Sequence, residues 1–213
     1  DWYYQLGATN INVLVEGFYT KLNNPFTAIS HEQEDQSVIK EIVNASGAKV
    51  YGANLEVRAA YRELFQLQVG ATLQKSLYDK AHKWSDDEDD NVKAEKRMLR
   101  TPNVYGYFIA TATPFKRFST NLSGKYTGDM LVPYEGGGKL NKTVKTPTFF
   151  ELGWKVAYQV PFYKGSSLEV NAGIQNIFNA YQDDFDKGPD RVSSYVYGPT
   201  LPRNYFAGMK LMF

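Results

Sequence analysis

The sequence predicts an all-β protein, namely an antiparallel transmembrane β-barrel. Three observations lead to this fold class. Apolar and polar residues alternate along most of the 213 residues, the alternating runs are long, and short and long connections take turns between the runs. A period of two is typical of strands whose two faces meet different surroundings.

The first half of the chain supplies five of the expected strands. Apolar residues alternate from Ile11 to Val15, and again without a break from Tyr51 to Tyr61. In the run 65–78 the apolar series is interrupted only at Lys75, and glutamine, glycine, threonine and serine fill the other face. The pattern is weakest in 102–113, which has aromatic residues on both faces. We expect these strands at 2–7, 11–21, 50–61, 65–78 and 102–113.

The second half supplies four more strands, at 118–130, 149–160, 168–175 and 202–213. In the second of these, apolar residues from Phe150 to Val160 oppose Glu151 and Lys155. In the last, every second residue back from Phe213 is apolar. Chain termini usually fray, so an alternating, aromatic-ended terminus is expected to be built into a sheet.

The lengths of the runs and of their connections favour a membrane barrel. Strands of globular proteins usually have about 5–6 residues, whereas a tilted membrane-spanning strand needs roughly 9–11. Short connections fall at 8–10, 61–64, 114–117 and 161–166, and long polar ones at 22–37, 79–101, 131–147 and 177–201. Short turns on one side and long loops on the other is the layout of outer-membrane barrels.

The alternation predicts an apolar outside and a polar inside. A soluble antiparallel sandwich or barrel also alternates, with its apolar side in a core, but it explains neither the strand lengths nor the loop asymmetry. In lipid an open sheet edge finds no hydrogen-bond partners, so the sheet must close. Charged residues expected to face the lumen are Lys125, Asp129, Glu151, Lys155, Glu169 and Lys210.

Composition excludes several function classes. The 24 Lys and Arg nearly balance the 23 Asp and Glu, so nothing indicates a nucleic-acid partner, and without cysteine there is neither a disulfide framework nor a thiolate metal site. His31 and His82 stand far apart without a serine–acid arrangement, which argues against zinc chemistry and leaves haem capture a lesser alternative to plain solvated loop residues. We find no catalytic constellation and expect no enzyme activity.

Several segments resemble the C-terminal part of TonB-dependent outer-membrane receptors, particularly those of Bacteroidetes. They are NVLVEGFYTKLNNPF, GAKVYGANLEVRAAY and, most distinctively, the last 46 residues from LEVNAGIQNIF onward. The last segment combines a penultimate strand ending in Asn176, Ile177 and Phe178, a long loop, Pro202-Arg203 and an aromatic final strand. The alternating end, with Tyr205, Met209, Leu211 and Phe213, also resembles the signal read by the barrel assembly machinery.

The resemblance implies a receptor in the outer membrane of a Gram-negative bacterium that imports a scarce, bulky ligand. Such a receptor has a 22-stranded barrel and a plug domain, and it draws energy from the TonB protein through its N-terminal region. Residues 1–213 would be about the last nine strands, without the plug and the earlier strands. The implied partners are lipid or lipopolysaccharide, the remaining strands and plug, and in some cases a surface lipoprotein. The ligand could be an iron–siderophore complex, haem, cobalamin or a glycan. The alternative is a complete eight-stranded barrel with a structural or adhesive role.

The long loops contain the candidate binding residues. Aromatic side chains there suit flat macrocyclic or sugar ligands, although a place in the interfacial girdle explains them equally well. We predict ligand contacts from Trp84, Tyr134, Arg191, Tyr195 and Tyr197.

Two acidic clusters could hold calcium, which prefers oxygen ligands. The run at 86–90 lacks the spacing of a calcium-binding loop, and we interpret it as a solvated loop tip. The second cluster includes a Gly188-Pro189 turn, so a calcium site at Asp183, Asp184 and Asp186 competes with a plain structural loop. No other cofactor is expected.

Overall fold

The structure of the protein is a computed structural model. The structure describes residues 1–33, 37–44, 46–85, 91–136, 141–163, 165–189 and 191–213. All regular elements in this part of the chain are β-strands. It contains no helix long and apolar enough to cross a membrane.

One antiparallel sheet carries the nine strands that the sequence predicts. Their hydrogen-bonded order follows the chain, β1-β2-β5-β6-β8-β9-β12-β13-β14, with short β7 as an extra partner of β6. Eight of the nine have nine or more residues, as expected for strands that cross a membrane. The strands are β1 (Trp2–Leu6), β2 (Thr9–Leu22), β5 (Ala48–Tyr61), β6 (Phe65–His82), β8 (Val104–Phe115), β9 (Phe118–Thr127), β12 (Phe149–Tyr163), β13 (Ser166–Gln175) and β14 (Asn204–Met212).

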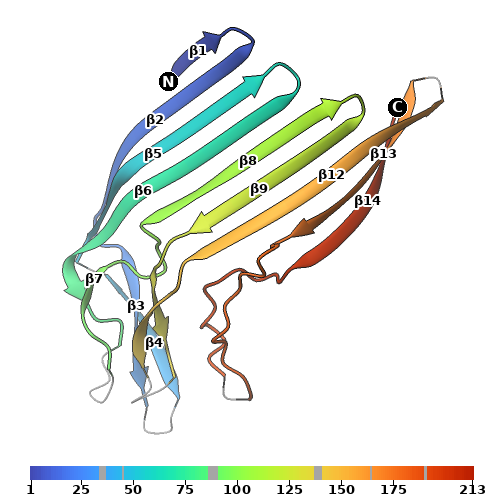
Figure 1. Ribbon diagram of the computed structural model, residues 1–213. Helices are drawn as coiled ribbons and strands as arrows, with labels where there is room; N and C mark the ends of the chain where they lie inside the picture. Colours follow the sequence, from blue (N-terminus) through green and yellow to red (C-terminus); the bar gives the residue numbers. More distant parts are fainter. Residues whose placement is uncertain (34–36, 45, 86–90, 137–140, 164, 190) are drawn as a thin grey trace.

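Short turns and long loops lie at opposite ends of this sheet, which confirms the predicted asymmetry. Figure 1 shows the four tight turns at the upper end, together with both chain termini, and all the long connections at the lower end. The tight turns reverse the chain with residues in the left-handed backbone region, including Gly7 (φ 59°), Arg62 (φ 49°), Arg117 (φ 70°) and Gly165 (φ 89°). This region favours glycine and is uncommon for other residues.

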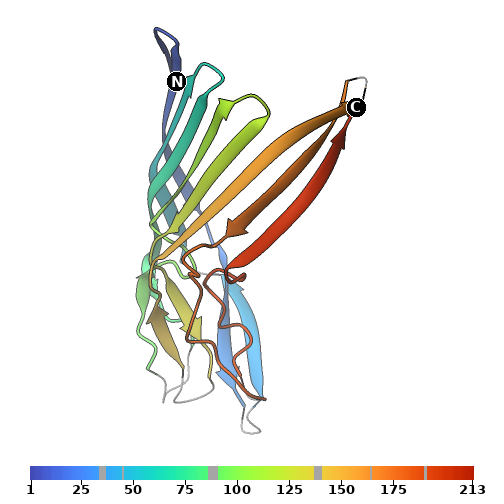
Figure 2. The same cartoon turned by 45° about the vertical axis from the view of Figure 1, so that its right-hand side comes forward.

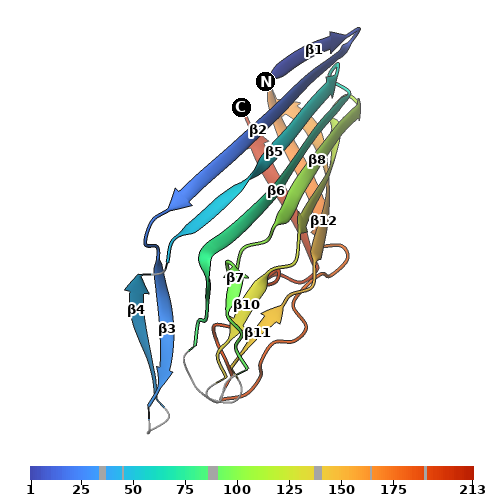
Figure 3. The same cartoon turned by 90° about the vertical axis from the view of Figure 1, so that its left-hand side faces the viewer.

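The loops contain more structure than the sequence indicated. We expected a plain loop at 22–37, but β3 (Phe26–Glu32) and β4 (Val38–Asn44) form a hairpin there that extends to residue 44. Within the expected loop at 131–147, β10 (Leu131–Tyr134) pairs with β11 (Lys142–Lys145). The short β7 (Glu95–Arg97) pairs with the end of β6. Figure 3 shows these small sheets below the main one.

The strand register sorts the side chains of the main sheet onto an apolar face and a polar face. The cross-strand row Val13, Val57, Val69 and Phe108 lies on the apolar face. The next row, Asn12, Arg58, Gln68 and Ile109, lies on the polar face. Residues of the apolar face are widely exposed, for example Leu73 (60%) and Met209 (75%). The sheet therefore has no core of its own on either side.

The buried apolar residues lie in the loops instead. A small core of Met130, Val132 and Tyr195 gathers where β10 meets the long loop that precedes β14. The loop end is therefore a packed layer in its own right.

Most aromatic residues of the apolar face gather in two girdles near the ends of the strands. On the loop side they are Tyr19, Tyr51, Tyr126, Phe150 and Tyr205, and on the turn side Tyr61, Phe65, Phe118 and Tyr158. Tyr51 and Tyr61 are ten residues apart (61 − 51), about 33 Å along a strand and about 25 Å in height if the strand tilts by about 40°. This equals the height of the apolar band of outer-membrane barrels.

The main sheet is curved and open. Figure 2 shows it as a trough, with β1 and β14 as its two edges. In the part of the chain that the structure describes, these edges pair with β2 and β13 respectively and not with each other. The nine strands thus do not form the closed eight-stranded barrel that was the alternative interpretation.

Candidate ligand-facing wall and loop cluster

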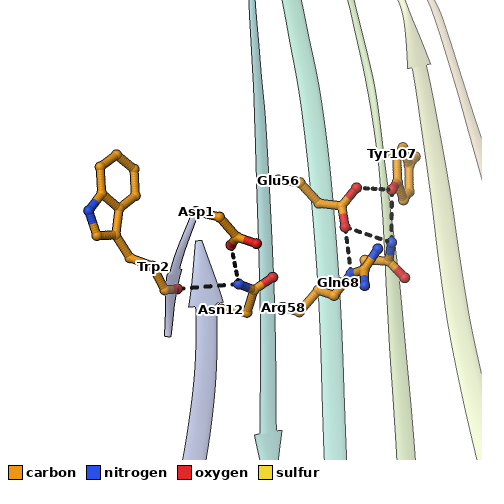
Figure 4. Close-up of polar contacts among 7 residues, drawn as sticks. All are labelled: Asp1, Trp2, Asn12, Glu56, Arg58, Gln68 and Tyr107. Atoms are coloured by element: carbon orange, nitrogen blue, oxygen red, sulfur yellow. Dashed lines mark hydrogen bonds and ion pairs between the residues drawn. The ribbon is translucent and has the colours of Figure 1, made fainter. Parts of the chain in front are cut away.

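A network of hydrogen bonds centred on Glu56 covers the polar face of β5, β6 and β8. The Tyr107 hydroxyl donates to Glu56 Oε2 (3.3 Å), and Gln68 Nε2 donates to the Tyr107 oxygen (2.9 Å) and to Glu56 Oε1 (3.4 Å). The Arg58 guanidinium pairs with Glu56 Oε1 at 2.5 Å. Figure 4 shows these four side chains converging. The carboxylate of Glu56 therefore holds Tyr107 and Gln68 in place on this exposed polar face. We call the polar face of the main sheet the polar wall.

Gly70 makes this arrangement possible because the Tyr107 ring lies across it. A Cβ added at Gly70 would be 2.4 Å from Tyr107 Cε1, far inside van der Waals contact. Phe206 covers Gly173 on the same face in the same way. At Gly70 and Gly173, the absence of a side chain thus leaves space on the polar face for an aromatic ring from the neighbouring strand.

Two hollows continue this wall toward the loop end. One, of about 570 Å³, is lined by Tyr105, Tyr107 and Lys125 on the strands and by Arg100 in the loop that follows β7. The other, of about 340 Å³, shares Tyr107 and Lys125 and extends to Glu151, Leu201 and Asn204. Since Leu201 and Asn204 come from the far end of the sheet, the last loop folds back over the polar face. The wall therefore offers aromatic surface, cations and amides to a solute.

A tyrosine–aspartate cluster locks the last loop to β10. The hydroxyls of Tyr195 and Tyr197 both donate to the Asp184 carboxylate, each at 2.7 Å. The Tyr134 hydroxyl donates to Asp186 Oδ2 at 2.8 Å. The Tyr195 ring packs edge-on against Tyr134 at a centroid separation of 4.9 Å. We call these five residues the loop cluster.

The loop cluster shifts the proton affinities of its members. Burial, followed by the contact with Asp184, raises the pKa of Tyr195 and of Tyr197 well above the usual tyrosine value. Burial alone would raise the pKa of Asp184, but the hydrogen bonds from Tyr197 and Tyr195 outweigh it and lower that pKa. The cluster is thus built from neutral phenols and an ionised carboxylate.

The structure brings some of the predicted ligand-binding residues together and separates others. Tyr134, Tyr195 and Tyr197 meet in the loop cluster, although Tyr195 is only 4% exposed. Trp84 lies elsewhere, 5% exposed, and donates from Nε1 to Thr143 Oγ1 at 3.0 Å. Arg191 is exposed and donates to the Gly188 carbonyl at 3.4 Å, its one hydrogen bond among the described residues. Ligand contact by these five residues stays a prediction.

The calcium prediction also stays open. Asp184 and Asp186 accept hydrogen bonds from tyrosines, and Asp186 also accepts one from the Val192 amide. Among the described residues no group of three or more acidic or histidine side chains is placed to hold a metal ion. The acidic run at 86–90 lies outside the described residues.

The residues of the predicted assembly signal lie where a recognition element would be accessible. Tyr205, Met209 and Leu211 share the apolar face of the edge strand β14. They are 71%, 75% and 48% exposed, and Phe213 beyond them is 95% exposed. Their role in assembly stays a prediction.

Sequence analysis missed the centre of the polar face and the tyrosine partners of Asp184 and Asp186. The aromatic pattern of 102–113 concealed that Tyr105 and Tyr107 belong to the polar face. The hydroxyls that donate to the two aspartates come from tyrosines more than ten residues away in the sequence. The available signal was the run of small residues opposite Tyr107, since a glycine in a strand often marks close approach of another group.

No protein-family model matches this sequence, and no curated protein sequence matches it significantly. Solved structures do. The chain is similar to the ferric-catecholate import receptor Fiu of E. coli K12 (TM-score 0.63, 17% identity), covering 97% of this chain and 26% of Fiu. It is similar to the siderophore receptor PirA of Acinetobacter baumannii (0.62, 12%), with coverage of 97% and 30%. It also resembles the iron transporter FrpB of Neisseria meningitidis (0.56, 16%), with coverage of 97% and 29%.

The chain spans less than a third of the length of these structural neighbours. Their similarity extends over nearly the whole chain at low sequence identity, so it establishes the fold and not the ligand. The nine-stranded sheet, its turn and loop ends and its long final loop therefore have the fold of the barrel wall of outer-membrane iron and siderophore receptors, the TonB-dependent class that the sequence resembles.

Proposed function

We propose that the chain forms C-terminal barrel strands of a TonB-dependent receptor in a Gram-negative outer membrane, and that its polar face lines the import path of an iron–siderophore complex. The observation that carries this proposal is the similarity over 97% of the chain to receptors and transporters for iron or siderophores. The role is non-enzymatic, with energy supplied through TonB.

The polar wall supports an import path because it combines exposed aromatic and ionic groups on a rigid sheet. Tyr105, Tyr107 and Lys125 line one hollow and are all exposed to solvent. Aromatic rings and cations suit ligands that carry planar, oxygen-rich and anionic groups. Haem, cobalamin and glycans are the competing ligand classes.

Uptake by the native host tests the ligand class. Cells lacking the gene, grown under iron limitation, are complemented with the wild-type gene or with the Y105A/Y107A variant, and uptake of radiolabelled ferric siderophores is measured. We expect uptake to be lost on deletion, restored by the wild type and reduced at least tenfold in the variant. Normal ferric siderophore uptake in the deletion strain, with loss of haem, cobalamin or glycan uptake, would replace iron–siderophore by that ligand.

We further propose that the plug and the remaining strands belong to the same polypeptide. Two observations support this. The open edges β1 and β14 have no second neighbour within the nine strands, which lipid does not tolerate, and the chain matches only 26–30% of each single receptor chain that it resembles. The mass of the denatured native polypeptide tests this. A mass several times 24.2 kDa agrees with the proposal, and a mass close to this value contradicts it.

A further inference from the structure

Charged residues are almost absent from the apolar face of the main sheet. Along the nine strands, in the part of the chain that the structure describes, this face carries four charged side chains: Lys21, Lys49, Lys75 and Asp79. All four lie at the loop ends of the neighbouring strands β2, β5 and β6. Charged residues that only increased solubility would be spread over all nine strands, not confined to the ends of three neighbouring ones.

The register places the three lysines close together. Lys21 is directly opposite Lys49, in the row just beyond the one in which Tyr19 faces Tyr51 and Tyr51 faces Lys75. Directly opposite residues of antiparallel strands have Cβ atoms about 5 Å apart, and diagonal ones about 7–8 Å. The three ammonium groups therefore share one patch, which we call the lysine rim.

The lysine rim is not neutralised by the described residues. None of its ammonium groups forms an ion pair with a carboxylate there, and Asp79 supplies a single negative charge on the same face. Like charges directly opposite on a sheet are destabilising. A fixed anion between Lys21 and Lys49 would reverse this repulsion.

The height of the lysine rim indicates where that anion comes from. Tyr19 and Tyr51, with ring centroids 6.5 Å apart, belong to the aromatic girdle on the loop side. Lys21 and Lys49 lie two residues beyond them, about 7 Å farther along the strand. Aromatic girdles sit at the level of lipid headgroups, and lysine side chains extend along the interface. The rim thus faces the phosphate layer of the leaflet on the loop side.

We propose that Lys21, Lys49 and Lys75 bind the phosphate groups of a lipid headgroup at the surface of the outer leaflet, with Tyr19 and Tyr51 packing beneath it. This inference rests on the outer-membrane location given under Proposed function but not on transport or on its ligand. Clusters of basic residues beside a membrane-spanning segment are recognised as sites for anionic lipid headgroups.

The experiment uses the complete receptor that contains this chain, purified from outer membranes in non-ionic detergent. The variants are K21Q/K49Q/K75Q, the charge-retaining K21R/K49R/K75R, and the control K93Q/K155Q/K210Q, which removes three lysines that lie off the apolar face. Folding is checked by heat-modifiable migration on gels. The probes are lipopolysaccharide with two phosphates, the same lipid after enzymatic dephosphorylation, and inorganic phosphate.

We expect the glutamine variant to bind phosphorylated lipopolysaccharide roughly a hundredfold more weakly, on the basis of about fivefold per lysine near an anionic surface. The arginine variant and the control should bind like the wild type, and dephosphorylated lipid should bind weakly to all. Equal binding by the glutamine variant and the wild type would overturn the inference, as would equal competition by inorganic phosphate, which would make the rim a general anion site. Absence of the receptor from the outer-membrane fraction would instead overturn the proposed location, so the two failures are distinguishable.

Discussion

Single residues decide how the polar wall presents its aromatic groups. Tyr107 is held in place by Gln68 and Glu56 through its hydroxyl and by Gly70 beneath its ring. Because the ring occupies the space that any other side chain at position 70 would need, the glycine is as important to the wall as the tyrosine.

Gly70→Val should destabilise the barrel by about 1–3 kcal/mol, the usual cost of overpacking, because its Cβ would start 2.4 Å from the Tyr107 ring. The midpoint of guanidinium-induced unfolding of the purified receptor measures the change. Gly17→Val is the matched control, since a Cβ there meets nothing within 4 Å and Gly17 lies in a strand of the same sheet. Equal shifts for both variants would contradict this role of Gly70.

The hydrogen bonds among Asp184, Tyr195 and Tyr197 should make the order of the last loop depend on pH in two ranges, one acidic and one alkaline. Its pKa is lowered in the folded loop, so its stabilising effect is present above the ordinary aspartate pKa and is lost as the pH falls through the lowered value. The pKa values of Tyr195 and Tyr197 are raised, so their effect is complete below about pH 10 and declines as the pH rises further.

Ultraviolet titration of tyrosinate and proteolysis of the last loop across the pH range measure these two effects. Asp184→Asn should return part of the tyrosine absorbance change to the ordinary range near pH 10 and speed cleavage at neutral pH. Asp183→Asn removes the same charge one residue away and should change little. Identical titrations for the two variants would show that Asp184 does not control these phenols.

At the scale of elements, the long loops form one layer, which we call the interlocked layer, because hydrogen bonds join one loop to another. Arg100, after β7, donates from Nη2 to the Ser194 carbonyl (2.7 Å) and from Nη1 to the Val196 carbonyl (3.1 Å). Trp84 reaches Thr143 on β11, and Tyr134 on β10 reaches the last loop. These hydrogen bonds connect three of the long loops to one another.

Arg100→Ala should loosen the last loop without unfolding the sheet. The two carbonyl groups lose their donor, and their segment should exchange amide hydrogens several-fold faster, because local openings expose them. Hydrogen–deuterium exchange with mass spectrometry on the whole receptor measures this. Arg191→Ala serves as the control because its guanidinium makes one long hydrogen bond to the described residues, within its own turn. Unchanged exchange at 194–196 in the Arg100 variant would contradict the interlocked layer.

The sequence predicted elements well where the pattern is local and long. Most strands of the main sheet follow from alternation, and the two kinds of connection follow from the lengths of the segments between the alternating runs. The hairpin at 26–44 was missed because its two strands have only seven residues each; the first was assigned to the polar loop 22–37, and the second was assigned to no element. In the second strand, VIKEIVN, apolar and polar residues come in pairs instead of alternating singly, so the period of two that marks the barrel strands is missing.

The candidate site was less predictable because it depends on which residues of distant strands face each other. Trp84 and Tyr195 were expected to meet ligand from their chemistry, yet both are almost fully buried. Alternation gives the face of a residue but not its partner, since a partner depends on the register between strands. The Tyr107–Glu56 contact spans 51 residues of sequence and could not be derived from either segment alone.

For the whole molecule, the final strand is predicted to direct assembly. Phe213→Ala should lower the amount of folded receptor in outer membranes several-fold, because it removes the exposed aromatic end of the apolar series on β14. Quantification of heat-modifiable receptor in the outer-membrane fraction measures this. Met212→Ala changes the neighbouring residue, which belongs to the other face, and should have little effect. Equal yields of the two variants would exclude a special role for Phe213.

The glycines that seat aromatic rings also constrain how the strands can align. The smallest slip that keeps the apolar face on one side is two residues. Such a slip would set Tyr107 against Gln68 or Thr72 in place of Gly70, and Phe108 against Leu122 or Tyr126 in place of Gly124. Phe206 would likewise lose Gly173. Three ring–glycine contacts, each between a different pair of strands, thus favour the native register. A shift in register at any of these strand pairs would place an aromatic ring against a larger side chain and destabilise the sheet.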